Sequence, residues 1–237
     1  MLRAIMSGNP ITIVISLFSY AIILLIATPV HECAHALVAY WLGDDTAARQ
    51  GRISLNPLAH FDPVGTISIL LFGIGWAKPV PVQPYRCRKV KTQKAAMALT
   101  AAAGPVSNVL MALVFMVISK LVLRLAPATM VTYYVFEALF EIVSINLSLG
   151  VFNLLPIPPF DGSRLFLAFL PSKYYFGIMK YEEIIKFVLL GLLFTGALQI
   201  PFGILADWIY SGLDFVSGFL GSMAGLESEL FTHLVAG

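Results

Sequence analysis

Residues 11–42, ITIVISLFSYAIILLIATPVHECAHALVAYWL, form an apolar run of 32 residues near the start of the chain. At about 1.5 Å per residue the run would make a helix roughly 48 Å long, whereas the hydrocarbon core of a bilayer is about 30 Å thick. Such a helix must tilt, bend at Pro29 or protrude from the bilayer. Because the run is also much longer than the apolar part of a cleavable signal peptide, we interpret it as a retained transmembrane helix.

The composition of the whole chain agrees with a membrane protein. Of its 237 residues, 59% are hydrophobic and 12% are charged, so a water-soluble domain of this size would lack a polar surface. The net charge is only +2, and no basic block is interleaved with aromatic residues, which argues against a nucleic acid as partner. The two cysteines, Cys33 and Cys87, lie in unlike settings and do not indicate a disulfide.

Three further segments have the length of a membrane span. Residues 95–119 and 187–206 contain no charged side chain, and residues 133–155 contain only Glu137 and Glu141, both near the start. Because about 20 predominantly apolar residues suffice to cross a bilayer as a helix, each segment is predicted to span it. Together with the first run, this predicts about four transmembrane helices.

Two other apolar stretches are predicted to lie at the membrane without a complete crossing. Residues 64–77 are too few to span and are interrupted by Gly73 and Gly75, which favours a re-entrant or surface-lying element. Residues 202–220 contain two aspartates and suit a surface-lying helix, although a span is not excluded. The overall prediction is an all-α integral membrane protein with a single multi-pass domain over residues 1–237.

Lys and Arg are concentrated in two of the predicted loops. Residues 43–94 contain eight of them and residues 161–186 contain four, and none follows Lys186. The remaining three are Arg3, Lys120 and Arg124. Since cytoplasmic loops hold an excess of Lys and Arg, these two loops are predicted to be cytoplasmic and both termini to face outward.

The first apolar run carries the H-E-x-x-H motif His31-Glu32-Cys33-Ala34-His35. On a helix the two histidines lie at i and i+4, on one face, with spacing that suits a single metal ion, and Glu32 is placed to act as a general base. The alternative is that these residues are polar groups packed between helices. That alternative leaves the desolvation cost of His31, Glu32 and His35 without compensation, so we favour metal binding.

A catalytic zinc ion usually takes three protein ligands, and Asp161 is the best candidate for the third. It follows a span that ends in Asn153-Leu-Leu-Pro-Ile-Pro-Pro-Phe-Asp161-Gly162, where three prolines deny helix hydrogen bonds. The alternative is an N-cap for a helix beginning near Ser163. By the predicted topology, however, Asp161 and both histidines lie at the cytoplasmic ends of their helices, which favours ligation.

Asn108 and His60 are less specific candidates. Asn108 ends Gly104-Pro-Val-Ser-Asn108 inside the second span, where its amide can hydrogen-bond a substrate carbonyl or oxyanion, or can join helices. The motif alone does not decide between the two. His60 lies in a loop at the predicted membrane surface, where a structural role is commoner than ligation.

Taken together, His31-Glu32-x-x-His35, Gly104-Pro105-x-x-Asn108 and Pro158-Pro159-Phe160-Asp161-Gly162 closely resemble, in order and spacing, the site-2 protease family of intramembrane zinc metalloproteases. Residues 51–66 and 75–82 resemble the compact prokaryotic branch, which has no PDZ-like or CBS domain. Phe160 stands where the family most often has leucine, a difference that leaves the ligand intact.

The resemblance implies one zinc ion per chain, bound by His31, His35 and Asp161. It also implies that Glu32 activates water and that Asn108 positions substrate or stabilises the oxyanion. A further implication is a short re-entrant, partly β element near residues 51–82.

The expected function is that of a zinc metalloendopeptidase in a prokaryotic-type cell membrane, with its active site toward the cytoplasm. Its partners would be the lipid bilayer and the transmembrane segment of a membrane-protein substrate. One alternative is a metal-ion transporter or a non-proteolytic metal-binding membrane protein, which gives Glu32 no task. Another is a diiron oxidase, for which four histidines are too few. The substrate, the regulator and the oligomeric state stay open.

Overall fold

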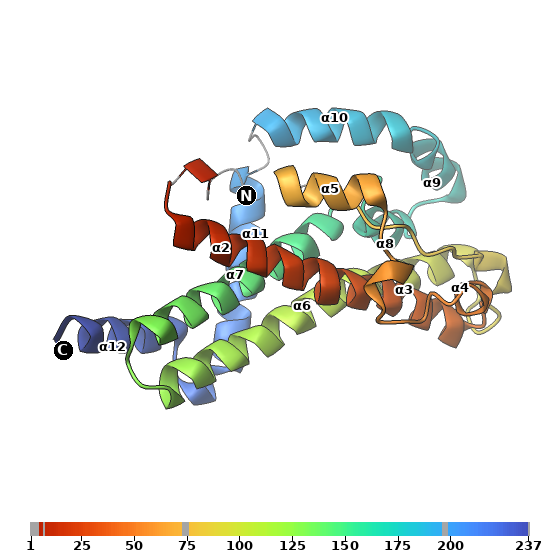
Figure 1. Cartoon of the computed structure of the whole chain (residues 1–237). Coiled ribbons are helices and arrows are strands. Elements are labelled where there is room, and N and C mark those ends of the chain that lie inside the picture. The colour runs from red at the N-terminus through yellow and green to blue at the C-terminus, as the bar shows by residue number, and fades with distance from the viewer. Residues whose placement is uncertain (1–4, 7, 73–75, 196–198, 237) are drawn as a thin grey trace.

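The computed structural model describes residues 5–6, 8–72, 76–195 and 199–236, and every regular element in these ranges is a helix (Figure 1). The elements, in chain order, are α2 (Pro10–Ile22), η1 (Ile23–Ala27), α3 (Thr28–Leu42), α4 (Thr46–Arg49), η2 (Pro57–Ala59), α5 (Pro63–Phe72), η3 (Pro84–Arg86), α6 (Gln93–Leu125), α7 (Met130–Asn153), α8 (Asp161–Leu167), α9 (Ser172–Met179), α10 (Glu182–Thr195), α11 (Gln199–Val216), η4 (Gly218–Leu220) and α12 (Met223–Ala236).

The first apolar run forms one long helix whose middle turn is wider than the rest. α2, η1 and α3 are continuous over residues 10–42, and η1 is a π-helical turn that ends just before Pro29. Proline has no N–H for the carbonyl four residues earlier, and a π-turn is a common way for a helix to adjust its hydrogen bonds at such a point. The helix therefore adjusts its hydrogen bonds next to Pro29 by a local π-turn.

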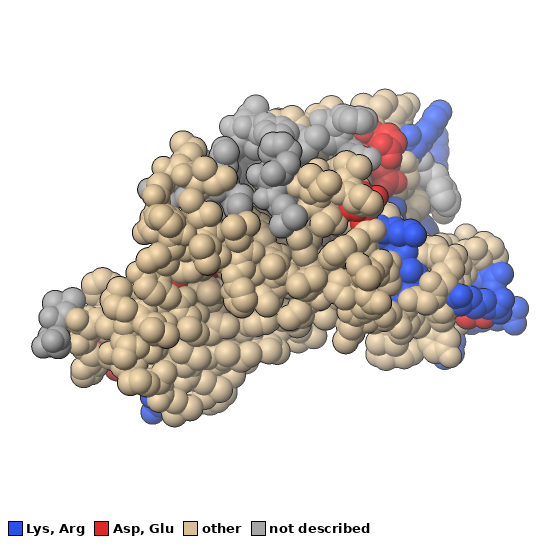
Figure 2. Space-filling view, viewed as in Figure 1, with Lys and Arg blue, Asp and Glu red and all other residues tan. Residues whose placement is uncertain are grey.

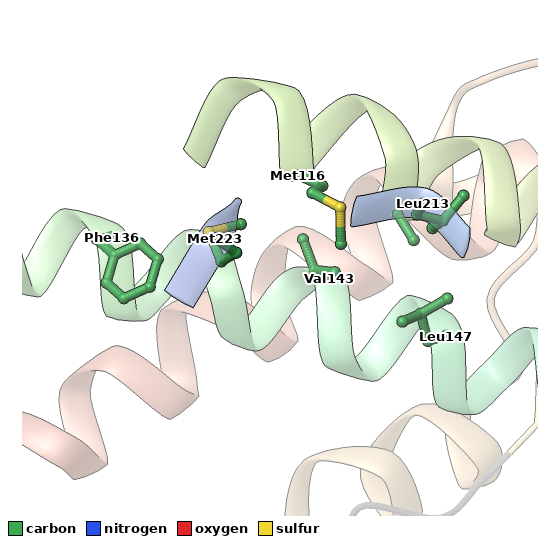
Figure 3. Packing of buried hydrophobic residues seen from close by; sticks show 7 residues of the cluster. Met116, Phe136, Val143, Leu147, Leu213 and Met223 are labelled. Atoms are coloured by element: carbon green, nitrogen blue, oxygen red, sulfur yellow. The ribbon is translucent and has the colours of Figure 1, made fainter. Parts of the chain in front are cut away.

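α6 and α7 form the centre of the fold. A four-residue turn joins them, and the hydroxyls of Thr92 and Thr129 cap their N-termini by accepting from Ala95 N and Thr132 N. Between them lies a buried apolar cluster that also receives residues from the C-terminal helices (Figure 3). Its members are Ala112, Met116, Phe136, Val143, Leu147, Leu213 and Met223.

Three helices in the described residues are long and apolar enough to cross a membrane: Pro10–Leu42, Gln93–Leu125 and Met130–Asn153. Only 28% to 39% of the most apolar window of each helix is buried inside the protein, so most of their apolar surface requires a lipid environment. The predicted all-α membrane fold and three of its four spans are thus confirmed at the level of helix length and composition.

The fourth predicted span is only partly covered by the described residues. Residues 187–206 cover the end of α10 and the start of α11, and residues 196–198 between them lie outside the described part. Pro201 falls in the first turn of α11, where proline is tolerated, whereas it would break the interior of a helix continuing from α10. Neither α10 nor α11 is a candidate span among the described residues.

The partly β element expected near residues 51–82 is also not observed. In the described portion of that range, which omits 73–75, the structure has η2, α5 and irregular chain, with no strand. Several prolines lie in this range, and proline cannot donate to a strand ladder. Residues 76–83 are irregular chain, held by hydrogen bonds with Arg52, His60 and Asp44.

The C-terminal helices are fastened to the C-terminal end of α6 by a buried ion pair. The Lys120 side chain is 0% exposed, and its Nζ donates to Asp214 Oδ1 at 2.7 Å and to the Asp214 carbonyl at 3.0 Å. Asp214 Oδ1 also accepts from Met223 N at 3.0 Å, which joins the end of α11 to the start of α12. The prediction of membrane orientation counted Lys120 as a charge in an exposed loop. The structure shows instead that Lys120 is buried in an ion pair.

Replacing Lys120 by Met is expected to destabilise the protein by about 3 kcal/mol, because it leaves Asp214 partly buried without its cation. Arg124→Gln is the matched control, since Arg124 donates only one exposed bond, to the Leu220 carbonyl at 3.2 Å, and its loss should cost less than about 1 kcal/mol. The measurement is unfolding in mixed micelles by detergent titration, followed by circular dichroism. Equal stability of the two variants would contradict the assigned role of the buried pair.

Candidate metal centre

Two histidines of α3 converge on one point. The His31 and His35 rings pack edge to face with centroids 4.7 Å apart, and their Nε2 atoms are 3.1 Å apart. Their helix ends at Gly43, whose φ of 110° is a left-handed C-cap conformation that suits glycine. The i, i+4 spacing read from the sequence therefore does bring both Nε2 atoms to one site.

Asp161 reaches the same point from the first turn of α8. Its Oδ2 lies 3.3 Å from His31 Nε2 and 3.2 Å from His35 Nε2. The chain turns sharply between α7 and α8, and Gly162 lies against the Leu154 carbonyl, where a Cβ atom would come within 2.2 Å of the oxygen. A residue larger than glycine at 162 would push Asp161 away from the histidines.

The three ligand atoms fit a tetrahedral zinc ion. Zinc bonds of about 2.0 to 2.1 Å place tetrahedral ligand atoms roughly 3.3 Å apart. The three separations in the structure range from 3.1 to 3.3 Å, and His31, His35 and Asp161 are the group among the described residues that could hold a metal ion. Two imidazole nitrogens and one carboxylate oxygen leave the fourth position open, as in catalytic zinc sites.

α6 supplies two features of this centre that sequence reasoning did not identify. The Thr100 carbonyl lies 2.7 Å from His35 Nδ1, so Nδ1–H donates to it and Nε2 is left free to bind a metal. One turn later, a Cβ atom on Gly104 would lie 2.4 Å from His35 Nε2 and 2.5 Å from His31 Nε2. Gly104 is thus the point at which the α6 backbone passes directly over the ligand atoms.

The Asp161 carboxyl is held in its ionised form. Burial alone would raise its pKa, but hydrogen bonds from protonated His31 and His35, together with their charges, outweigh burial and lower the pKa below its usual range; a metal ion bound at the two Nε2 atoms would take the place of these protons. Asp161 is consequently a carboxylate at neutral pH, which is the form that ligates a metal.

The two predicted catalytic residues lie on the helices that build the centre. Glu32 follows His31 on α3, is half-buried, and forms no ion pair with any residue that the structure describes. Asn108 lies one turn beyond Gly104 on α6, is 1% exposed, and its buried Oδ1 has no hydrogen-bond partner in the described part of the chain. An unpaired buried amide oxygen requires a partner, which water or a bound substrate can supply.

His60 has a structural contact and is not part of the ligand group. It is fully buried, its Nε2 lies 2.7 Å from the Ser54 carbonyl, and its own carbonyl accepts from Lys78 N at 2.8 Å. These bonds join residues 54, 60 and 78 into one unit. These hydrogen bonds agree with a structural role for His60.

Comparisons with known proteins agree with this geometry. The profile of Peptidase family M50 matches residues 122–196, a range that includes Asp161. Three relatives from the curated proteins carry the name "Putative zinc metalloprotease". YwhC of Bacillus subtilis is 44% identical over 154 residues, which cover 64% of this chain and 69% of YwhC. Rip2 of Mycolicibacterium smegmatis is 28% identical over 203 residues, which cover 82% of this chain and 73% of Rip2.

The third relative, MJ0611 of Methanocaldococcus jannaschii, is 36% identical over 102 residues, which cover 43% of this chain and 48% of MJ0611. No solved structure matches the chain. The similarity to YwhC is high and extends over more than two thirds of that protein, and the family profile agrees with it. This chain belongs to peptidase family M50, the site-2 protease family of zinc metalloproteases.

Proposed function

We propose that this protein is a one-domain zinc endopeptidase that hydrolyses peptide bonds within or next to the transmembrane segments of membrane-protein substrates. The observation that carries the proposal is the convergence of His31 and His35, in the C-terminal half of the first membrane-length helix, with Asp161 at the start of α8, and with Glu32 adjacent on α3. A metal centre built on membrane-length helices suits a substrate that is itself in the membrane.

The chemistry divides between the metal and the protein's own side chains. One zinc ion per chain, held by His31, His35 and Asp161, would lower the pKa of a bound water to about 7 and polarise the scissile carbonyl. Glu32 accepts the proton of the attacking water and passes it to the leaving amine. The Asn108 side-chain amide donates to the developing oxyanion or to a neighbouring substrate carbonyl.

The substrate helix must unwind before it can be cut, because a helix hides its carbonyl carbons behind its own hydrogen bonds. Residues 76–82, which we call the strap, form no helix or strand, and we propose that their backbone contacts the unwound substrate segment. The Lys78 N–H of the strap donates to the His60 carbonyl, and η2, which directly precedes His60, packs on α3. Its position supports a role in presenting the substrate to the metal centre.

A metal-ion transporter or a non-proteolytic metal-binding protein is the main rival. Either would use the same three ligands, but neither gives Glu32 a task, and membership of a peptidase family argues against both. The two alternatives also predict that loss of Glu32 leaves the function of the protein unchanged, whereas a protease without Glu32 should bind zinc and fail to cleave.

The orientation of the site follows from the charge distribution. Figure 2 shows Lys and Arg gathered at the end of the molecule near α3, α4 and α9, while the flanks of the long helices are almost free of charge. Of the charges counted for the opposite side, Lys120 is buried in an ion pair and Arg124 binds the Leu220 carbonyl. This distribution supports a cytoplasmic site in the cell membrane.

A topology experiment tests this orientation. In a background without Cys33 and Cys87, a cysteine at Arg88 or Lys173 should be protected from an impermeant thiol reagent added to intact cells, and one at Ser222 should react. Labelling of each cysteine after the cells are opened shows that it is accessible in principle. The reverse pattern would place the metal centre on the outer side.

Asp161→Ala should abolish cleavage and lower the zinc content of the purified protein, because two histidines alone make a weak site. Glu182→Ala is a suitable control, since Glu182 forms only a 3.4 Å bond with Arg164 and lies outside the ligand group. Zinc per protein, measured by elemental analysis, decides the matter. A variant that keeps one tightly bound zinc ion would show that Asp161 is not a ligand.

Glu32→Gln separates the general base from the ligands, because the amide keeps the size of the side chain but cannot accept the proton. The variant should retain zinc and lose about 10²- to 10⁴-fold in cleavage rate, the usual contribution of general acid–base catalysis. His35→Ala should instead lose zinc and activity together. The readouts are zinc content and fragment yield from a panel of single-span substrates in detergent. Near-normal cleavage by zinc-loaded Glu32→Gln would refute the assignment.

A further inference from the structure

Two membrane-length helices, α3 and α6, share one end, where backbone contacts join them. α3 ends at Leu42, and the Leu42 carbonyl accepts a hydrogen bond from Lys89 N at 3.1 Å. The segment also passes close to Gly43, because a Cβ atom there would lie 3.3 Å from the Arg86 carbonyl and 3.3 Å from Arg88 N. α6 begins directly after this segment, at Gln93. Residues 86–92 therefore lie against the end of α3 and lead into α6.

Three cations of this segment are exposed and have no acidic partner. Arg88, Lys89 and Lys91 form no ion pair with any residue that the structure describes. The two neighbouring acids are already engaged, since Asp45 pairs with other arginines and Asp44 is fully buried. α6 has no acidic residue in its first turn, so the positive end of its dipole adds to these charges. This end of the molecule thus carries positive charge without a counter-ion in the described chain.

Two large aromatic side chains lie at the same end. Tyr40 and Trp41, in the last turn of α3, are 50% and 58% exposed. Tyrosine and tryptophan are enriched at the headgroup level of a bilayer, where the ring contacts apolar chains and its polar atom reaches water. We call Tyr40, Trp41, Arg88, Lys89 and Lys91 the basic patch. It belongs to the end of the molecule at which Figure 2 shows Lys and Arg gathered.

An anionic phospholipid matches both parts of the basic patch. Its phosphate neutralises the cations, and its acyl chains contact the aromatic rings and the apolar flanks of α3 and α6, most of which are not buried inside the protein. Each Lys or Arg beside the end of a membrane helix strengthens binding to an anionic membrane surface by about fivefold. An acidic soluble protein would match the charges but would leave the exposed rings and the adjoining apolar surface without a partner.

We propose that the basic patch binds the headgroup of an anionic phospholipid and thereby holds the C-terminal end of α3 at the membrane surface. His35 lies seven residues before Leu42 on the same helix, which corresponds to about 10 Å. A lipid bound at the patch therefore acts on the helix that carries two of the metal ligands. Lipid binding is measured without a substrate, so it holds or fails independently of the proposed function.

The experiment measures lipid binding through the fluorescence of Trp41. The chain has three tryptophans, so Trp76→Phe and Trp208→Phe leave Trp41 as the only one. This protein is reconstituted into nanodiscs that contain phosphatidylglycerol and phosphatidylcholine, one of which carries bromine atoms on its acyl chain close to the headgroup. Bromine quenches tryptophan on contact, so the ratio of quenching by the two brominated lipids gives their relative affinity for the patch. Circular dichroism checks that each variant is folded.

Phosphatidylglycerol should be preferred over phosphatidylcholine by at least about fivefold, the contribution of one cation. Arg88→Gln, Lys89→Gln and Lys91→Gln together should reduce the preference to less than about twofold, because the headgroup then meets no uncompensated cation. High salt should weaken the preference of the unchanged patch, since its charges are exposed. The control combines Lys173→Gln with Lys180→Gln, which removes two exposed lysines outside the patch and should keep the full preference.

Equal quenching by the two lipids with the patch intact would overturn the proposal and make an acidic protein the better candidate for its partner. A preference that survives the triple substitution, or that the lysine control loses equally, would also overturn it, because the overall charge of the protein would then be the cause. If the triple variant does not accumulate, Lys89→Gln alone should lower the preference about two- to fivefold. An unchanged preference in that single variant is equally decisive against the proposal.

Discussion

The structure depends on the close approach of the α6 backbone to two histidine side chains at Gly104. No side chain separates the helices there, and Thr100, one turn earlier on α6, accepts the hydrogen bond that fixes the orientation of the His35 ring. With α6 in contact with α3, and α7 packed on α6, the turn after α7 brings Asp161 to the same point. One glycine thus allows three polar ligands, distant in sequence, to meet inside an apolar protein.

The ligands could be predicted from the sequence because each sits in a pattern with one geometrical outcome. His31 and His35 face the same way on any helix, and the prolines before Asp161 end the preceding helix wherever it packs. The roles of Thr100 and Gly104 could not be predicted in the same way. Threonine and glycine have many uses in a membrane helix, and only the packing of α6 on α3 shows which apply.

The predictions that differ from the structure concern segments without such a pattern. The span predicted for residues 187–206 stays a prediction, because residues 196–198 lie outside the described part of the chain. The partly β element was implied by resemblance alone. The prediction that Lys120 is a loop charge was wrong because its partner, Asp214, lies 94 residues away in the sequence. Their ion pair depends on packing that the sequence around Lys120 does not show.

Arg52 and Lys120 solve the same physical problem in two parts of the chain. Each is a buried cation that donates to backbone carbonyls of a segment remote in sequence. Lys120 is also paired with Asp214, so it neutralises a charge while it fastens the C-terminal helices, which suits a permanent contact. Arg52 has no carboxylate partner in the described residues and binds carbonyls only, so it fixes the course of the chain at Lys78 and Pro79 without neutralising a charge.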